Sequence, residues 1–125
     1  MSAGFWAVPD VGDVRTPAAM LKEQASALTD ATKGLLQAEV ATSSESQSIN
    51  HTLFITAPAL SGFRYSVLSY KHTILLYPGT VFIPFRGTAF QVSNEEEFTN
   101  LLKNTLSSKE ISNVISSLLI QSRDG

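Results

Sequence analysis

The spacing of apolar residues first predicts a helix near the N-terminus. After Thr16-Pro17, apolar side chains recur at helical intervals, with Thr32 in the same stripe: Leu21, Ala25, Leu28 and Leu35. Thr16 can cap the free amide groups, and Pro17 suits the first helical position. Gly34 is a natural stop because glycine readily adopts the left-handed conformation. We therefore expect a helix that opens at Thr16-Pro17 and ends at Gly34.

Two alternating runs then predict a β-hairpin. Apolar and polar residues alternate over residues 36–41 and again over residues 49–57. The polar residues 42–48 between them indicate a turn or a short loop. Pro58 ends the second run, because proline lacks the amide that a strand donates to its neighbour.

A third strand is expected over residues 63–72, but its alternation is blurred. Strict alternation divides its large side chains between the two faces: Phe63, Tyr65 and Val67 on one, and Leu68 and Tyr70 on the other. Residues 74–77 are apolar on both faces, and residues 77–80 have the form of a type II turn. A further strand follows over residues 81–85, and Pro84 either makes it an edge strand or cuts it short.

Two helices complete the pattern. Ser93-Asn94-Glu95-Glu96 has the form of a capping box with Ser93 as the cap, and residues 107–110 repeat the device. Two apolar stripes follow these caps: Phe98, Leu101, Leu102 and Leu106, then Ile111, Val114, Ile115, Leu118 and Leu119. The last five residues are expected to fray.

The element order predicts an α+β domain over residues 16–122, preceded by an extended arm over residues 1–15. The domain is expected to have an N-terminal helix, a four- to five-stranded antiparallel sheet, and two C-terminal helices packed on one face. The arm contains Phe5, Trp6 and Val8, which are costly to leave in water, so we expect it to dock on its own domain or on a neighbour.

Composition adds the expectation of a partner. Charged residues make up 16% of the 125 residues, against about 25% in typical domains, and the mean hydropathy is +0.08. Four apolar residues fall in the register of the sheet's second face: Phe54, Leu68, Tyr70 and Phe82. We therefore expect this face to be covered by a second subunit, by another protein or by the arm.

Charge and hydropathy also exclude several classes. The formal net charge of −2 offers no footprint for nucleic acid, and the glutamates that open the first C-terminal helix would repel phosphate. No apolar run approaches the roughly 18 residues of a membrane span, and the first residues lack the basic start of a signal peptide. We expect a cytoplasmic protein, and the absence of cysteine fits a reducing compartment.

Candidate chemistry is sparse. The sequence has no nucleophile elbow, phosphate-binding loop or zinc-protease motif, so we expect neither catalysis nor a cofactor. Alternation points His51 toward the core, and His72 ends the third strand. Two histidines on neighbouring strands could begin a metal site, but the sheet supplies no carboxylate as a third ligand. The simpler expectation is no metal, with each histidine hydrogen-bonded to its surroundings.

The charge distribution suggests a binding surface. Residues 46–94 contain no Asp or Glu, but they contain Arg64, Lys71 and Arg86. Acidic residues are depleted in strands generally, which explains the pattern without a function. Alternatively, the sheet meets an acidic partner through its tyrosines: Tyr65, Tyr70 and Tyr77.

Motifs across residues 16–80 resemble those of a group of small bacterial proteins. They include Thr16-Pro17, Leu21-Lys22-Glu23-Gln24, Gly34-Leu35-Leu36, Thr42-Ser43, His51, Ala57-Pro58-Ala59-Leu60, Tyr65, His72 and Leu76-Tyr77-Pro78. The resemblance implies a bacterial, cytoplasmic protein and carries no activity with it. It marks His51, Tyr65, His72 and Tyr77 as positions to inspect.

Two functional hypotheses follow. The first is a non-catalytic interaction module, homodimeric or bound to another protein, of the immunity-protein or secretion-chaperone type. The second is a small-ligand binder or minor enzyme with a pocket near His51, Arg64, Tyr70 and His72. The candidate binding residues are His51, Arg64, Tyr65, Tyr70, Lys71, His72 and Tyr77.

Overall fold

A computed structural model describes residues 4–124 of the chain. Its elements are, in order, α1 (Pro17–Ala31), β1 (Gln37–Glu45), β2 (Ser48–Ala57), the short 3₁₀ helix η1 (Pro58–Leu60), β3 (Phe63–His72), β4 (Gly79–Ile83), β5 (Thr88–Val92), α2 (Glu95–Leu106) and α3 (Lys109–Asp124). The five strands form one antiparallel sheet in the order β1-β2-β3-β4-β5, so each strand pairs with the next in sequence. The predicted α+β class is confirmed.

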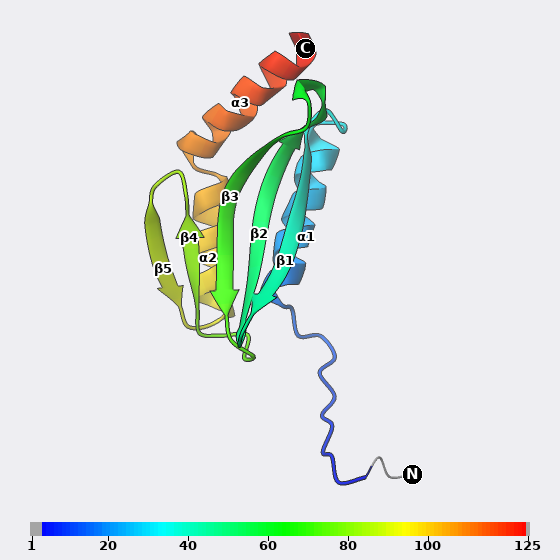
Figure 1. The fold of residues 1–125 in the computed structure, drawn as a ribbon, viewed down its shortest axis with the longest axis vertical. Helices are drawn as coiled ribbons and strands as arrows, with labels where there is room; N and C mark the ends of the chain where they lie inside the picture. Colours follow the sequence, from blue (N-terminus) through cyan, green and yellow to red (C-terminus); the bar gives the residue numbers. More distant parts are fainter. Residues whose placement is uncertain (1–3, 125) are drawn as a thin grey trace.

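The helices lie on one side of the sheet. In Figure 1, α1 and α2 lie behind the sheet, and the start of α3 joins them, so the face toward the viewer carries no helix. We call these two sides the covered face and the open face. The hydrophobic core lies between the covered face and the helices, and includes Leu21, Leu53, Leu68, Val81 and Phe98.

The first helix begins as its sequence predicts. The Oγ1 of Thr16 accepts a hydrogen bond of 3.0 Å from the amide of Ala19, and Pro17 occupies the first turn. The helix ends at Ala31, and the chain then turns through positive φ at Lys33 and Gly34. Because this turn rotates the chain, Leu36 rather than Leu35 enters the core.

The first hairpin is longer than predicted. The pairing of β1 with β2 continues to Glu45 opposite Ser48, so Ser46 and Gln47 alone form the turn. Ser46 has a φ of +53°, which such tight hairpin turns require. The expected loop over residues 42–48 is therefore wrong. These polar residues form strand because β1 lies at the sheet edge, where both faces tolerate water.

A β-bulge in β3 explains its blurred alternation. Leu53 of β2 pairs with Leu68, whereas the next residue, Phe54, pairs with Ser66, so Val67 has no partner. The extra residue places both Val67 and Leu68 on the covered face, each with about 1% of its surface exposed. The prediction that Leu68 and Tyr70 belong to the second face of the sheet is wrong. Phe54, as predicted, points to the open face.

The connection from β3 to β4 also differs from the prediction. The Tyr77–Pro78 peptide is cis, and Gly79 lies in strand β4 without a positive φ, so the segment is not a type II turn. Gly79 is required for a different reason: a Cβ at this position would overlap the ring of Tyr70. β4 ends at Ile83, as expected from the proline that follows it.

The C-terminal helices are capped one residue later than predicted. Asn94, not Ser93, is the N-cap of α2, and its Oδ1 accepts from the amide of Glu97 at 2.9 Å. Glu97 in turn accepts from the amide of Ser93 at 2.7 Å. The predicted fraying is also wrong up to Asp124, because α3 continues through that residue and buries Ser122.

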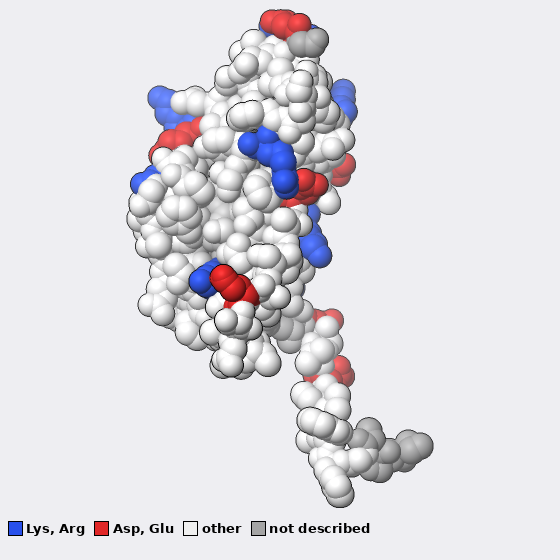
Figure 2. Space-filling view, viewed as in Figure 1, with Lys and Arg blue, Asp and Glu red and all other residues white. Residues whose placement is uncertain are grey.

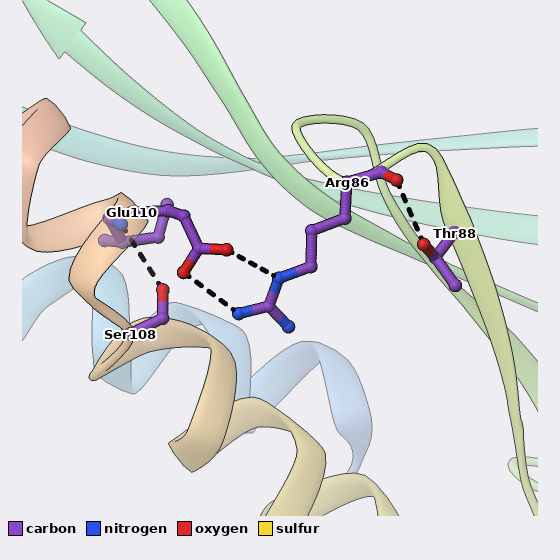
Figure 3. Close-up of polar contacts among 5 residues, drawn as sticks. Arg86, Thr88, Ser108 and Glu110 are labelled. Carbon is purple, nitrogen blue, oxygen red and sulfur yellow. Dashed lines mark hydrogen bonds and ion pairs between the residues drawn. The ribbon is translucent and has the colours of Figure 1, made fainter.

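An ion pair fastens α3 to the β4–β5 turn. Figure 3 shows the guanidinium of Arg86 donating to both carboxylate oxygens of Glu110, at 3.2 and 3.3 Å. These hydrogen bonds are the main reason that the pKa of Glu110 lies below its ordinary value. Arg86, one of the three cations in the acid-free stretch, is therefore occupied within the fold.

The arm leaves the domain without touching the sheet. Residues 4–15 extend away from the body in Figure 1, and Phe5 and Trp6 are fully or largely exposed. At the root of the arm, Arg15 forms an ion pair of 2.7 Å with Glu23 of α1. The expectation that the arm docks on its own domain is wrong for these residues, and residues 1–3 lie outside the described part.

Candidate functional site

The candidate binding residues separate onto the two faces of the sheet. His51, Tyr70 and His72 lie on the covered face, together with Tyr77 from the following loop, as the ring contacts among these four show. The remaining candidates do not join them: Arg64 and Lys71 project from the open face, and Tyr65 packs half-buried against the core. The site therefore consists of the four clustered residues and the groups that they contact.

The two histidines meet end to end. The Nε2 atoms of His51 and His72 are 3.1 Å apart, and the residues are 7% and 6% exposed. His51 pairs across the ladder with Tyr70, so His72 is its diagonal neighbour, a position that large side chains can reach. The expectation that each histidine is hydrogen-bonded to its surroundings is confirmed, and one partner of each is the other histidine.

The surrounding oxygens fix the proton positions when both rings are neutral. Nδ1 of His72 faces the carbonyl oxygens of Thr73 and Leu75 at 2.6 and 3.0 Å, so this nitrogen must donate. Nε2 of His72 is then an acceptor, and Nε2 of His51 donates to it. Nδ1 of His51 accordingly accepts from the hydroxyl of Thr42 at 2.9 Å. The result is a directed chain of hydrogen bonds from Thr42 to the carbonyls of the β3–β4 loop.

Tyr70 anchors the aromatic part of the site. It is completely buried, with its ring centre 5.2 Å from that of His72 and 4.9 Å from that of Phe98 of α2. Its hydroxyl donates to the carbonyl of Leu76 at 2.6 Å. The interpretation of Tyr70 as a surface contact residue is wrong, because the bulge in β3 turns it into the core.

Burial governs the ionisation of these groups. Desolvation is the largest cause that lowers the pKa of His51, followed by repulsion from His72 and from Lys22 of α1. Burial raises the pKa of Tyr70 and of Tyr77 to about 12, and it also raises that of Tyr65. The lowered pKa favours the neutral form of His51, and the raised pKa values keep the tyrosines protonated.

Arg64 is separated from the histidines by the sheet itself. Its guanidinium lies 4.0 Å from the ring centre of Phe54 and 3.1 Å from the carboxylate of Glu39, all on the open face. A pocket shared by His51, Arg64, Tyr70 and His72, as the second hypothesis requires, is therefore wrong. Successive strand residues point to opposite faces, and the bulge in β3 places Arg64 on the face opposite to Tyr70 and His72.

A metal site finds no support in the donor set. Within residues 4–124, no three His, Cys, Asp or Glu side chains come close enough together to hold an ion. The two histidines are neighbours, as a metal site would need, but the carboxylates of this chain lie elsewhere.

Two features of this end of the sheet were missed at the sequence level. The first is Thr42, which was assigned to a loop; in the true hairpin it lies directly opposite His51. Continuing the predicted strand pairing through residues 42–45 would have placed Thr42 opposite His51. The second is the exposure of Ile74 and Leu75, which the β3–β4 loop presents to solvent although their apolar character indicated strand.

Comparisons of the chain with protein-family models, with curated proteins and with solved structures gave no match in any of the three. The function must therefore be argued from the geometry. None of the helices in residues 4–124 has the length and apolar content needed to cross a membrane.

Proposed function

We propose that this protein is a protein–protein interaction module, a bacterial cytoplasmic accessory protein of the immunity or secretion-chaperone kind. Its binding surface is the end of the domain from which the arm extends, together with the arm itself. We call this surface the apolar end and define it as Phe5, Trp6, Val8, Val11 and Val14 of the arm, with Ile74 and Leu75 of the β3–β4 loop.

The observation that supports this proposal is the exposure of these side chains. Trp6 is 79% exposed, Ile74 is 88% exposed and Leu75 is 64% exposed. Burying one such side chain contributes about 1.5–3 kcal/mol, so a partner that covers several of them gains a substantial binding energy. Large apolar side chains left exposed in such number on one arm and one loop favour an interaction surface.

The arm joins the domain at the same end as the β3–β4 loop, although its first described residues extend away from the body (Figure 1). Figure 1 shows the arm leaving from the end of the sheet where β3 finishes and the β1–β2 turn lies. A shallow groove at this end is lined mainly by apolar surface, with Ile49 and Ile74 beside the turn residues Ser46 and Gln47. A partner could therefore contact the arm, the loop and the groove together.

The open face has a different character. Figure 2 shows few charged side chains on it, and its strands contribute mainly Ser, Thr, Asn and Ala beside Phe54 and Phe82. Phe82 is 44% exposed, so this face adds some apolar area. It lacks the dense apolar cover that we expected from the sequence, which moves the proposed contact from the open face to the apolar end.

Native mass spectrometry of the protein purified gently from its own cells tests this function. We expect a mass of two chains, or of one chain with a second polypeptide. The double variant Phe5→Ser with Trp6→Ser should reduce the complex to a single chain, and so should Ile74→Ser with Leu75→Ser.

The matched control is Phe63→Ser, since Phe63 is 50% exposed but lies at the other end of β3. It should leave the complex intact. A wild-type protein that runs as a bare monomer at cellular concentration contradicts the proposal, and so does a complex that survives both double variants.

A further inference from the structure

The hydrogen-bond chain at the histidines begins at the hydroxyl of an exposed residue. Thr42 lies on the edge strand β1 and is exposed, whereas His51 and His72 are buried. Its Oγ1 lies 2.9 Å from Nδ1 of His51, within the range of a good hydrogen bond. Most strand threonines of this protein have no such partner: Thr80, for example, is exposed on the open face away from both histidines.

The order of groups along this series of hydrogen bonds is that of an activated nucleophile. A hydroxyl contacts the free nitrogen of a neutral imidazole, and the other nitrogen of that imidazole donates to a group that holds it in place. The third group, His72, is itself fixed by two backbone carbonyls of the β3–β4 loop. The same logic of hydroxyl, base and orienting acceptor occurs on unrelated folds, where geometry rather than sequence defines it.

The surroundings of His51 keep its resting form neutral, which a general base requires. His72 of β3 and Lys22 of α1 face it, and Thr42 of β1 completes the surroundings. Burial, together with repulsion from His72 and Lys22, disfavours a resident proton on His51, so Nδ1 is unprotonated at rest and accepts from Thr42.

We propose that Thr42 is a nucleophile for acyl transfer, with His51 as its general base and His72 as the positioning residue. This activity is independent of the partner binding proposed above. The substrate class is a carboxylic ester with a good leaving group. An acyl-threonine would be formed first and then hydrolysed by water.

The proposed step balances without any further reactant. Oγ1 of Thr42 attacks the carbonyl carbon while Nδ1 of His51 takes the hydroxyl proton. The bond between the carbonyl carbon and the leaving oxygen then breaks, and His51 returns the proton to that oxygen. The products are the ester of Thr42 and a free alcohol. Throughout, the Nε2–H of His51 stays donated to His72, which stabilises the transient imidazolium.

Reaction with p-nitrophenyl acetate tests the proposal on the full-length protein. We expect a burst of p-nitrophenolate equal to the protein concentration, and a peptide map that places one acetyl group on Thr42. Thr42→Ala should abolish the burst, Thr42→Ser should retain it, and the matched control Thr80→Ala should not change it. His51→Gln should slow acetylation at least about 100-fold, the low end for general base catalysis.

The role of His72 needs a readout beyond activity. His72→Gln retains an acceptor for the Nε2–H of His51 and should keep most of the burst, whereas His72→Leu should lose it while still melting cooperatively. The burst rate should fall at acidic pH as His51 becomes protonated. Acetyl groups found on lysines alone, or an equal burst from Thr42→Ala, would overturn the proposal. An unchanged rate in folded His51→Gln would remove His51 as the base.

Discussion

Neighbouring residues of one strand have opposite environments on the two faces of the sheet. Tyr70 and His72 are buried on the covered face, while Lys71 between them is exposed on the open face. On the covered face, the two histidines and Tyr70 make hydrogen bonds that lead to backbone carbonyls. On the open face, the polar contacts are solvent-exposed and isolated. The groups with which a strand residue can interact therefore depend on the face that it occupies, rather than on its proximity in sequence.

The difference has an energetic origin. A polar group taken out of water costs free energy unless a partner replaces the water, so the covered face retains only histidines and tyrosines that fit its geometry. The Arg64–Glu39 pair of the open face is about half exposed on each side, and such pairs contribute about 0–1 kcal/mol. Substitutions on the two faces should accordingly differ in both size and cause.

The largest effect is expected at Gly79, where β4 crosses the ring of Tyr70. Gly79→Ala would place a Cβ inside that ring, so either Tyr70 or the strand must move. We expect a loss of about 3 kcal/mol in the free energy of unfolding, measured by urea denaturation. The neighbouring open-face variant Thr80→Ala should stay within about 0.5 kcal/mol of wild type. Similar stabilities for the two variants would contradict the contrast between the faces.

Two buried tyrosines should respond with different signs. Tyr70→Phe leaves the carbonyl of Leu76 without its donor and should cost about 1 kcal/mol. The hydroxyl of Tyr77 is buried without a hydrogen-bond partner among the described residues, so Tyr77→Phe should be neutral or slightly stabilising. Thermal melting of the two variants side by side measures the difference. Equal losses would show that both hydroxyls are paired in solution.

Acid should weaken the covered face through His51. Because its pKa in the folded protein lies below the ordinary 6.5, the unfolded chain binds this proton more readily. The stabilisation is complete above pH 6.5 and is lost as the pH falls through the folded-state pKa. Urea titrations from pH 7.5 down to about pH 5 should show this decline, since histidine titrates in that range. His51→Gln should have a shallower decline, and an identical slope would exclude His51 as its source.

The smallest effect is expected for the ion pair of the open face. Arg64→Ala removes the contacts with Glu39 and with the ring of Phe54, both at the surface. We expect the free energy of unfolding to fall by about 0.5–1 kcal/mol. Part of this difference should persist in high salt, because salt screens the contact with the ring less than it screens the ion pair. Lys71→Ala, which removes an exposed cation from the same face, serves as the matched control. A loss comparable to that of Gly79→Ala would mean that the open face is not simply solvated.

Local signals in the sequence predicted most of the elements. The cap at Thr16 and the apolar stripes of α2 and α3 depend on neighbouring residues only, and the structure confirms the helices that they indicate. The face of each β3 residue could not be predicted in the same way. The bulge at Val67 is defined by pairing with β2, so a strict count of alternating positions fails beyond it.

The candidate site was predicted in part for the same reason. His51 could be placed on the core side because β2 has no irregularity before it, and His72 was marked for its strand end. Their contact, however, depends on a diagonal across two strands. Thr42 was missed because an edge strand need not alternate, so its polar sequence was typical of a loop. Arg64 was misplaced because linear proximity says nothing about which face a residue occupies.

The strand order has a consequence for how the chain acquires its structure. Since every strand pairs with its successor, each hairpin can close over a short stretch of chain and the sheet can grow one strand at a time. The contact between α3 and η1 joins segments that are far apart in sequence, so it must wait for the sheet. We expect folding rates typical of mixed α/β domains, with the docking of α3 as a late event, and substitutions in that contact should mainly accelerate unfolding.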